Sequence, residues 1–325
     1  MGGMQPATSI PPESAPAISV QGLTKRYGTR TVVDRLDIDV PRGSIAGFVG
    51  PNGAGKTTTM SMLLGLVKPS DGAGEVLGES LGHPAAYLPR VGALIESPAF
   101  YPALTARQNL RMLATIGGHD ERRIDAVLDE VGLLDRDGDR GDDRYRSYSL
   151  GMKQRLGIAA GLLGDPELLI LDEPANGLDP EGVREMRALL GRMAGSGRTV
   201  LVSSHDLSEL EQICDWLVLI DTGRSLYQGP TSELLASGAA TGIDVVPQHL
   251  GDVERLFDLL VLDGTTVERG ERGLVVSPGD AEIAIDTLAA HINHTAHSAG
   301  IVLVELTPRR RTLEDQFLTM IGAHR

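Results

Sequence analysis

The octapeptide GPNGAGKT at residues 50–57 combines glycines, a lysine and a threonine in the spacing G-x-x-x-x-G-K-[ST]. Glycines let backbone N–H groups turn inward around an anion, and the helix expected at 56–66 adds partial positive charge at its start. Lys56 can reach outer phosphates, and Thr57 can place its hydroxyl on Mg²⁺. A plain glycine-rich turn is the simpler alternative. The predicted nucleotide-binding residues are Gly50, Pro51, Asn52, Gly53, Ala54, Gly55, Lys56, Thr57 and Thr58.

Two further apolar runs of strand length end in polar residues that suit the same chemistry. LLILDEP at 168–174 ends in Asp172, which is placed to hold Mg²⁺, and Glu173, which could polarise an attacking water. TVLVSSHD at 199–206 carries His205 beyond its end, where it could contact a γ-phosphate. In a parallel sheet these strand ends and the phosphate loop would converge on one crevice. An acidic turn and a structural histidine are the simpler alternatives.

The segment SYSLGMKQR at 147–155 offers a second helix start upstream of the acidic strand. Ser149 can cap the helix expected at 149–163, and Gly151 leaves its backbone exposed to an anion. The first helix start already serves the nucleotide, so two explanations stay open for the second. It is either an ordinarily capped helix or a phosphate contact in a partner subunit.

One carboxylate stands in an apolar stretch, VGALIESPAF at 91–100. Glu96 is the only charged side chain there, and it lies between an apolar run and a Ser-Pro turn signal. A charge beside apolar strand residues needs water, a partner or a metal. The sequence therefore raises the question of what Glu96 faces.

Composition limits the classes of function. The chain has 325 residues, 41% of them hydrophobic, and a formal net charge of −14, which disfavours a general nucleic-acid binder. A single cysteine, Cys214, rules out a disulfide framework within the chain and fits a reducing compartment. No run approaches the roughly 18–20 apolar residues of a membrane helix. Work at a membrane would therefore require a partner.

The chain is expected to hold two domains joined by a linker. Residues 1–16 predict a disordered lead-in, and 17–235 alternate strands and helices, with a helix at 104–115 that carries a Thr105–Gln108 capping box. Residues 236–242, SGAATG and its preceding residue, predict a linker. Residues 243–325 follow the order βαββαβ, which predicts a small ferredoxin-like α+β domain.

These residues together resemble the ATP-binding-cassette (ABC) ATPases. GPNGAGKTT resembles their Walker A motif, LLILDE their Walker B motif, and NGLD at 176–179, which ends in Asp179, their D-loop. SLGMKQR resembles the signature sequence with Ser149 and Gly151 in register, and His205 stands at the switch histidine. Tyr27 lies where the family often stacks an aromatic ring on adenine, although it could simply cover a strand edge.

The resemblance implies a fold and an assembly. The fold would be an α/β P-loop NTPase core with an antiparallel β subdomain and a helical subdomain. Each ATP, with Mg²⁺, would lie between the Walker motifs of one subunit and the signature helix of another. The chain would therefore form a homodimer, or a heterodimer with a similar ATPase. Lys56, Glu173 and His205 would carry catalysis, and Ser149, Gly151 and Asp179 would meet the nucleotide.

Two departures from the family pattern point to a branch. Leu150 replaces a glycine and Met152 the glutamine of the signature, and Glu96 stands at the usual Q-loop glutamine. These variants look most like bacitracin- and lantibiotic-type exporter ATPases, whose membrane path is a separate permease. The expected function is an exporter ATPase at the cytoplasmic face of the membrane. Glu96 would face Mg²⁺ or its water shell; a surface carboxylate is the simpler alternative.

Two other classes of function stay open at this stage. One is a soluble ABC ATPase acting on ribosomes or DNA, which the single cassette and the negative charge disfavour. The other is a regulatory sensor whose C-terminal domain binds a ligand. The transported substrate does not follow from these residues.

Overall fold

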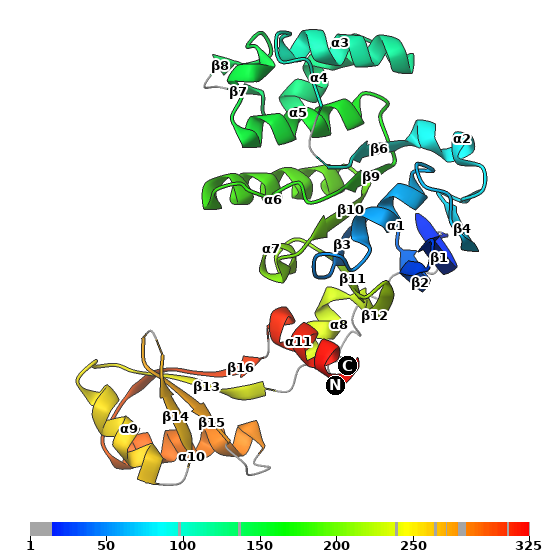
Figure 1. The fold of residues 1–325 in the computed structure, drawn as a ribbon. Helices are drawn as coiled ribbons and strands as arrows, with labels where there is room; N and C mark the ends of the chain where they lie inside the picture. Colours follow the sequence, from blue (N-terminus) through cyan, green and yellow to red (C-terminus); the bar gives the residue numbers. More distant parts are fainter. Residues whose placement is uncertain are drawn as a thin grey trace, which may run out of the picture. The chain divides into compact units, whose positions relative to one another are not determined.

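The chain forms two compact units, Met1–Thr231 and Ser232–Arg325 (Figure 1). The computed structural model describes residues 15–96, 99–135, 138–237, 240–262, 265–270, 272–278, 284–310 and 312–324. The predicted lead-in at 1–16 lies outside these ranges except for its last two residues. None of the described helices is long and apolar enough to span a membrane.

The first unit begins with an antiparallel sheet in the order β2-β1-β4-β5. Its strands are β1 (Ile18–Tyr27), β2 (Arg30–Val40), β4 (Asp71–Val76) and β5 (Glu79–Ser80). Buried and exposed residues alternate along most of β2, so one face of the sheet is packed and the other is wet. The segments ISVQGLTKRY and TVVDRLDIDV alternate apolar and polar residues, which predicts antiparallel strands with one wet face, and the pairing of β1 with β2 confirms it.

A six-stranded sheet forms the centre of the first unit, in the order β12-β11-β3-β10-β9-β6. Its strands are β3 (Ile45–Val49), β6 (Val91–Leu94), β9 (Leu168–Leu171), β10 (Thr199–Ser204), β11 (Trp216–Asp221) and β12 (Arg224–Pro230). All are parallel to their neighbours except β12, an antiparallel edge strand. The predicted parallel convergence of β3, β9 and β10 is confirmed, because β10 pairs with both of the others.

Helices cover the central sheet and hold it against the antiparallel sheet. Helix α1 (Lys56–Leu63) contributes Met60, Met62 and Leu63 to one apolar cluster with residues of both sheets. Helix α6 (Pro180–Gly195) packs on β10 and β3. The remaining short elements are α2 (Pro84–Tyr87), a 3₁₀ turn (Leu88–Arg90) and α7 (Leu207–Glu211). This packing places the carboxyl ends of the parallel strands next to the start of α1.

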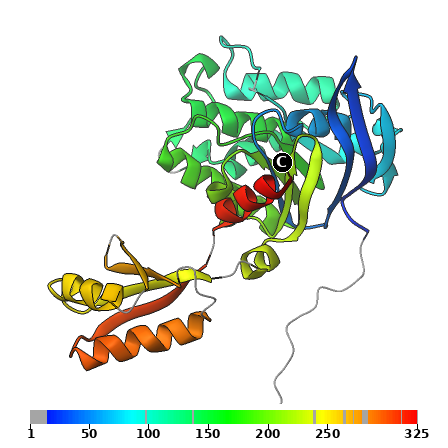
Figure 2. The same cartoon turned by 60° about the horizontal axis from the view of Figure 1, so that its bottom comes forward.

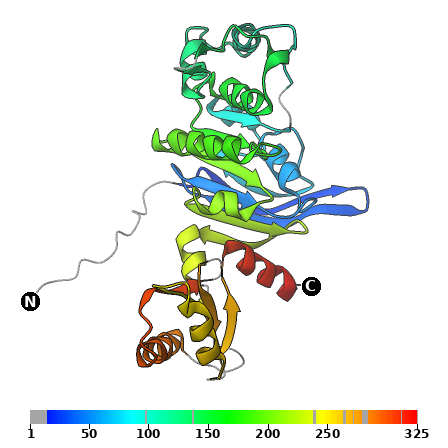
Figure 3. The same cartoon turned by 90° about the vertical axis from the view of Figure 1, so that its left-hand side faces the viewer.

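Three helices form a separate subdomain after β6. They are α3 (Ala106–Gly117), α4 (Arg123–Glu130) and α5 (Leu150–Leu162), with a small hairpin of β7 (Leu134–Asp135) and β8 (Gly138–Asp139) and a 3₁₀ turn (Tyr145–Ser147). Figures 1 and 3 both show them grouped at one end of the central sheet. The predicted capping box is confirmed, because the Thr105 hydroxyl accepts from Gln108 N and Gln108 Oε1 accepts from Thr105 N.

The second unit contains a four-stranded antiparallel sheet in the order β14-β15-β13-β16 (Figure 2). Helices α9 and α10 contact each other and share one buried core with the strands. The elements are α8 (Thr231–Ser237), β13 (Ala240–Pro247), α9 (Asp252–Leu262), β14 (Thr266–Arg269), β15 (Leu274–Ser277), α10 (Ile285–Ser298), β16 (Leu303–Arg310) and α11 (Leu313–His324). From β13 to β16 this is the order and pairing of the split βαβ motif.

Residues at both ends of the predicted linker, 236–242, belong to a helix and a strand in the structure. Its first residues end α8, and its last residues begin β13, where Ala240 and Gly242 pair with β16. A Cβ on Gly242 would lie 2.8 Å from the Val276 carbonyl oxygen of β15. The glycine therefore allows close approach of two strands, whereas the sequence pattern predicted a linker.

Candidate nucleotide site

The loop before α1 leaves the start of that helix without a side-chain cap. Gly55 is the N-cap residue with φ 105°, and Gly53 has φ 84°, both in the left-handed region that favours glycine. A Cβ on Gly50 would lie 2.4 Å from the Ile220 carbonyl oxygen of β11. The sequence therefore needs glycine for this loop shape, and the uncapped N–H groups of α1 suit an anion.

Glu173 lies between Lys56 and His205 at the carboxyl edge of the central sheet. Lys56 Nζ is buried, donates to the Gly50 carbonyl at 2.6 Å and lies 3.4 Å from Glu173 Oε1. Glu173 Oε2 lies 3.3 Å from His205 Nδ1. Three side chains predicted from separate motifs thus form one contiguous group, because β3, β9 and β10 end side by side.

A second group contains Thr57, Asp172 and Ser203. The Thr57 hydroxyl donates to Asp172 Oδ2 at 2.7 Å, so two oxygens of the type that Mg²⁺ prefers already lie together. The Ser203 hydroxyl donates to Asp172 Oδ1 at 2.5 Å and lies 2.8 Å from the Glu173 backbone nitrogen, from which it accepts. One buried hydroxyl therefore fixes both acids, and Glu173 holds a φ of 47° there.

Two further residues, Ser203 and Arg30, belong to this region without having been predicted from the sequence. Ser203 is fully buried near the end of the apolar strand β10, and a hydroxyl at such a position was the available signal. Arg30 and Val32 of β2 line the same hollow as the phosphate loop and Glu173. Arg30 is also paired with Tyr27 across the β1–β2 turn. Arg30 carried no sequence signal beyond following an aromatic residue and a glycine turn.

Tyr27 ends β1, and its side chain is 51% exposed. The Lys25 ammonium lies 4.9 Å from the centroid of the Tyr27 ring. The exposed ring, on the strand end that pairs with Arg30, is available for stacking. The role of Tyr27 toward adenine stays a prediction.

Glu96 follows β6 at the same edge of the sheet. β6 pairs in parallel with β9, and the Asp172 backbone N–H donates to the Leu94 carbonyl at 2.8 Å. Glu96 is exposed and has φ 60°, a left-handed conformation that is uncommon for glutamate. Within the described ranges no hydrogen bond joins Glu96 to Thr57 or Asp172, and no group of three or more His, Cys, Asp or Glu residues could hold a metal ion.

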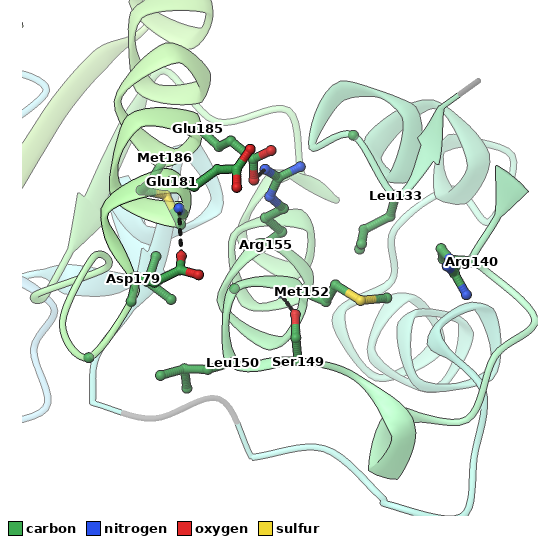
Figure 4. A pocket seen from close by; sticks show the side chains of 15 residues that line it. Leu133, Arg140, Ser149, Leu150, Met152, Arg155, Asp179, Glu181, Glu185 and Met186 are labelled. Carbon is green, nitrogen blue, oxygen red and sulfur yellow. Dashed lines mark hydrogen bonds and ion pairs between the residues drawn. The ribbon is translucent and has the colours of Figure 1, made fainter. Parts of the chain in front are cut away.

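The remaining predicted residues line a different pocket of about 570 Å³ (Figure 4). Ser149 caps α5, and its hydroxyl accepts from Met152 N at 3.2 Å. Asp179 caps α6 by accepting from Gly182 N at 2.8 Å. Ser149, Gly151 and Asp179 therefore lie together, but the lining of this pocket shares no residue with that of the phosphate loop. Their contact with a nucleotide stays a prediction.

The fold and these contacts define a class of protein, the P-loop ATPases with a strand–loop–helix phosphate site. Residues 33–176 match the family described as ABC transporter. The bacitracin transport ATP-binding protein of Bacillus licheniformis is 49% identical over 67% of this chain and 71% of that protein. The protein of the same description from Enterococcus faecalis is 37% identical over 94% of this chain and 96% of that protein.

A solved structure agrees with these relatives. The ATP-binding subunit of an ABC transporter is 31% identical and has a TM-score of 0.59, over 68% of this chain and 92% of that chain. The chain belongs to the ABC transporter ATPase family. Members of this family bind ATP, dimerise and work with membrane permease components.

Proposed function

We propose that this protein is the ATP-hydrolysing subunit of an exporter, of the drug or peptide-antibiotic type, and that it drives a separate membrane permease. The observation that carries the hydrolytic part is the group formed by Lys56, Glu173 and His205 beside the phosphate loop. The relatives that transport bacitracin support the exporter part, because one of them matches almost the whole chain, the second unit included. The site would face the cytoplasm from the inner side of the membrane.

Lys56 and the uncapped start of α1 would bind the phosphates of ATP. Phosphate oxygens compete with Glu173 for the Lys56 ammonium, which now lies 3.4 Å from the carboxylate. Once Lys56 turns to phosphate, Glu173 is free to accept a proton from an attacking water. His205, beside Glu173, would donate a hydrogen bond to the γ-phosphate as charge develops on it.

The residues present fit a magnesium ion, although Asp172 is the one carboxylate among the two side chains that would hold it. Thr57 Oγ1 and Asp172 Oδ2 lie 2.7 Å apart and would hold the ion, with phosphate and water oxygens completing its shell. Bound Mg²⁺ would neutralise charge that develops on the transferred phosphoryl group. Ser203 keeps Asp172 turned toward Thr57 by donating to its other oxygen.

Two copies of the chain, or this chain and a similar ATPase, would enclose two nucleotides. In that arrangement the start of α5, with Ser149 and Gly151, would face the nucleotide of the second copy. This assignment gives a purpose to the open pocket at Ser149, which holds no residue of the phosphate loop. ATP would close the dimer, and hydrolysis would reopen it.

Glu96 would transmit the presence or absence of bound Mg²⁺ to the helical subdomain. It lies between β6, whose end pairs beside Asp172, and the chain segment that leads to α3. A glutamate offers a stronger acceptor than glutamine and no amide donor. We therefore infer that Glu96 couples Mg²⁺ occupancy to residues 90–115 and through them to the permease.

Purification from membranes tests the proposed function directly. The full chain is captured under mild detergent, and the integral membrane protein that accompanies it is identified by mass spectrometry. We expect a polytopic permease whose presence raises the ATPase rate of the complex above that of the free chain. Recovery of ribosomes or nucleic acid alone would contradict the exporter function.

A further inference from the structure

The hydroxyl of Ser203 stands between the two acidic residues that follow β9. Ser203 lies on β10 and is fully buried. The last pair of the β9–β10 ladder joins Leu171 to Val202, so Ser203 is the first residue of β10 beyond that ladder. It therefore lies level with Asp172, at the point where β9 has ended and the chain continues to Glu173.

The direction of both hydrogen bonds at Ser203 follows from their chemistry. A backbone N–H can only donate, so the Ser203 oxygen accepts from Glu173 N at 2.8 Å. The one hydroxyl proton of Ser203 is then donated to Asp172 Oδ1 at 2.5 Å. The Thr57 hydroxyl donates to the other oxygen of the same carboxylate at 2.7 Å. The orientation of Asp172 and the position of the Glu173 backbone are therefore linked through a single side chain.

The backbone of Glu173 has a conformation that needs such support. Its φ is 47°, in the left-handed region, where a residue with a Cβ is strained. On one side, the Asp172 N–H donates to the Leu94 carbonyl at 2.8 Å. On the other side, the Asn176 N–H donates to the Glu173 carbonyl at 3.1 Å. The N–H of Glu173 itself lies beyond the strand ladder, and the Ser203 side chain takes the place of a ladder carbonyl.

A second hydroxyl on β10 provides a comparison. Thr199 begins the strand and is buried, and its hydroxyl accepts from Gly43 N at 2.9 Å. Like Ser203, it satisfies a backbone N–H of another segment of the chain. Thr199 lies at the amino end of the strand, however, and Ser203 at the carboxyl end beside the acids. The two hydroxyls make the same kind of contact, and Ser203 is the one of the two that touches Asp172 and Glu173.

We propose that Ser203 is a positioning residue that holds Glu173, the base, in a fixed relation to Asp172, which would hold Mg²⁺. This inference rests on the proposed function, in which Glu173 accepts a proton from water. Ser203 itself would touch neither nucleotide nor water, because it is fully buried. Its loss should therefore lower turnover far more than it weakens ATP binding, which Lys56 and the start of α1 carry.

The contact is tested by amide hydrogen exchange of the full chain without nucleotide. Exchange is measured by mass spectrometry on peptides that contain Glu173. We expect Ser203→Ala to raise the exchange rate there by about tenfold or more, because the Glu173 N–H loses its acceptor. Thr199→Ala should leave this segment unchanged and speed exchange at Gly43 instead. Wild-type exchange at Glu173 in Ser203→Ala would overturn the contact.

The role in catalysis is tested by steady-state ATP hydrolysis at saturating Mg²⁺. For Ser203→Ala we expect kcat to fall by about tenfold, with KM for ATP within about twofold of wild type. Ser203→Thr keeps the hydroxyl and should restore kcat to within about threefold of wild type. Thr199→Ala, the matched control, should keep both constants although it loses a comparable buried hydrogen bond. Equal losses of kcat in Thr199→Ala and Ser203→Ala would overturn the positioning role.

A double variant shows whether the effect passes through the base. In the Glu173→Gln background, Ser203→Ala should change the residual kcat by less than about twofold, because a side chain that cannot accept a proton gains nothing from its position. A further fall of about tenfold in the double variant would overturn the route through Glu173.

The outcomes separate this inference from the proposed function. A folded wild-type chain that binds ATP and hydrolyses none would refute the proposed function and the positioning role that rests on it, whereas hydrogen exchange would still establish the contact. Wild-type hydrolysis together with a fully active Ser203→Ala variant would refute the positioning role alone and leave the exporter function standing.

Discussion

The starts of α1 and α5 are two helix N-termini that the chain prepares in opposite ways. At α1 the N-cap is Gly55 in a left-handed conformation, and no side chain accepts from the first N–H groups. At α5 the N-cap is Ser149, whose hydroxyl accepts from Met152 N. The first start therefore keeps its donors for a ligand, whereas the second has satisfied one of them internally.

The surroundings of the two helix starts differ in the same sense. Next to α1, the buried Lys56 is held by a carbonyl and by Glu173 within the same chain. Next to α5, Leu150 is 45% exposed and lines an open pocket. The start of α1 is therefore surrounded by polar groups of its own chain, whereas the start of α5 opens on a surface pocket. The predictions below test that contrast, from the largest expected effect to the smallest.

Replacing the carboxylate of Glu173 should nearly abolish ATP hydrolysis at the site beside α1. Glu173→Gln keeps the size of the side chain but cannot accept a proton, so we expect ATP turnover to fall by about a hundredfold or more. Binding of ATP should persist, because Lys56 loses only a competitor. Phosphate release and the Kd for ATP are the measurements. A turnover rate equal to that of wild type would remove Glu173 from the role of base.

Filling the glycine that caps α1 should close the anion site. Gly55→Ala forces alanine to φ 105° and brings its Cβ within 3.0 Å of the Val32 carbonyl, at a cost of about 1–2 kcal/mol. We expect the Kd for ATP to rise by about tenfold or more. Gly191→Ala in α6, where nothing lies within 4 Å, is the control and should leave Kd unchanged. Equal affinities in both variants would contradict the contrast between the two helix starts.

Replacing Tyr27 tests whether its ring belongs to the nucleotide site beside α1. If the ring stacks on adenine, Tyr27→Ala should raise the Kd for ATP by about fivefold, which corresponds to about 1 kcal/mol. Lys25→Ala removes the cation beside the ring but keeps the ring, so its effect should be smaller. Unchanged affinity in Tyr27→Ala would take this residue out of the site.

Replacing the N-cap residue Ser149 tests the start of α5, for comparison with the start of α1. Ser149→Ala should lower the free energy of unfolding by about 1 kcal/mol, because Met152 N loses its acceptor. The Kd for ATP of the isolated chain should not change, whereas the ATPase rate of the dimer should fall. A weaker Kd in the isolated chain would show that the α5 start serves the same nucleotide as α1.

Exchanging the carboxylate at Glu96 should have the smallest effect. Glu96 is exposed, so Glu96→Gln is expected to change the Mg²⁺ concentration for half-maximal ATPase by only about two- to fivefold. Coupling to the permease should change with it. If the Mg²⁺ dependence and the permease-stimulated rate both matched wild type, Glu96 would be a surface carboxylate and nothing more.

Local patterns explain what the sequence predicted well. The capping box at Thr105, the cap at Ser149 and the phosphate loop each depend on neighbours within a few residues, so spacing alone revealed them. Continuous apolar runs such as those at 168–172 and 199–204 are typical of strands covered on both faces, and β9 and β10 are buried throughout. The linker at 236–242 was misread because glycine marks both flexible chain and close strand contact, and only the partner at β15 distinguishes the two.

Non-local contacts explain what the sequence left open. The bridging hydroxyl of Ser203, the position of Arg30 beside the phosphate loop and the packing of Leu150 on Gly177 each join segments far apart along the chain. None of them has a spacing rule, because the distance between the segments depends on how the sheets and helices pack.

The sequence by itself determined which residue types could bind phosphate, hold a metal and activate water, since each follows a strand or starts a helix in its own motif. The tertiary structure alone decided that Glu173 contacts both Lys56 and His205, while Ser149 and Asp179 line a separate pocket. The physical reason is the strand order. β10 lies between β3 and β9 and brings their ends together, whereas α5 belongs to a subdomain that follows β6.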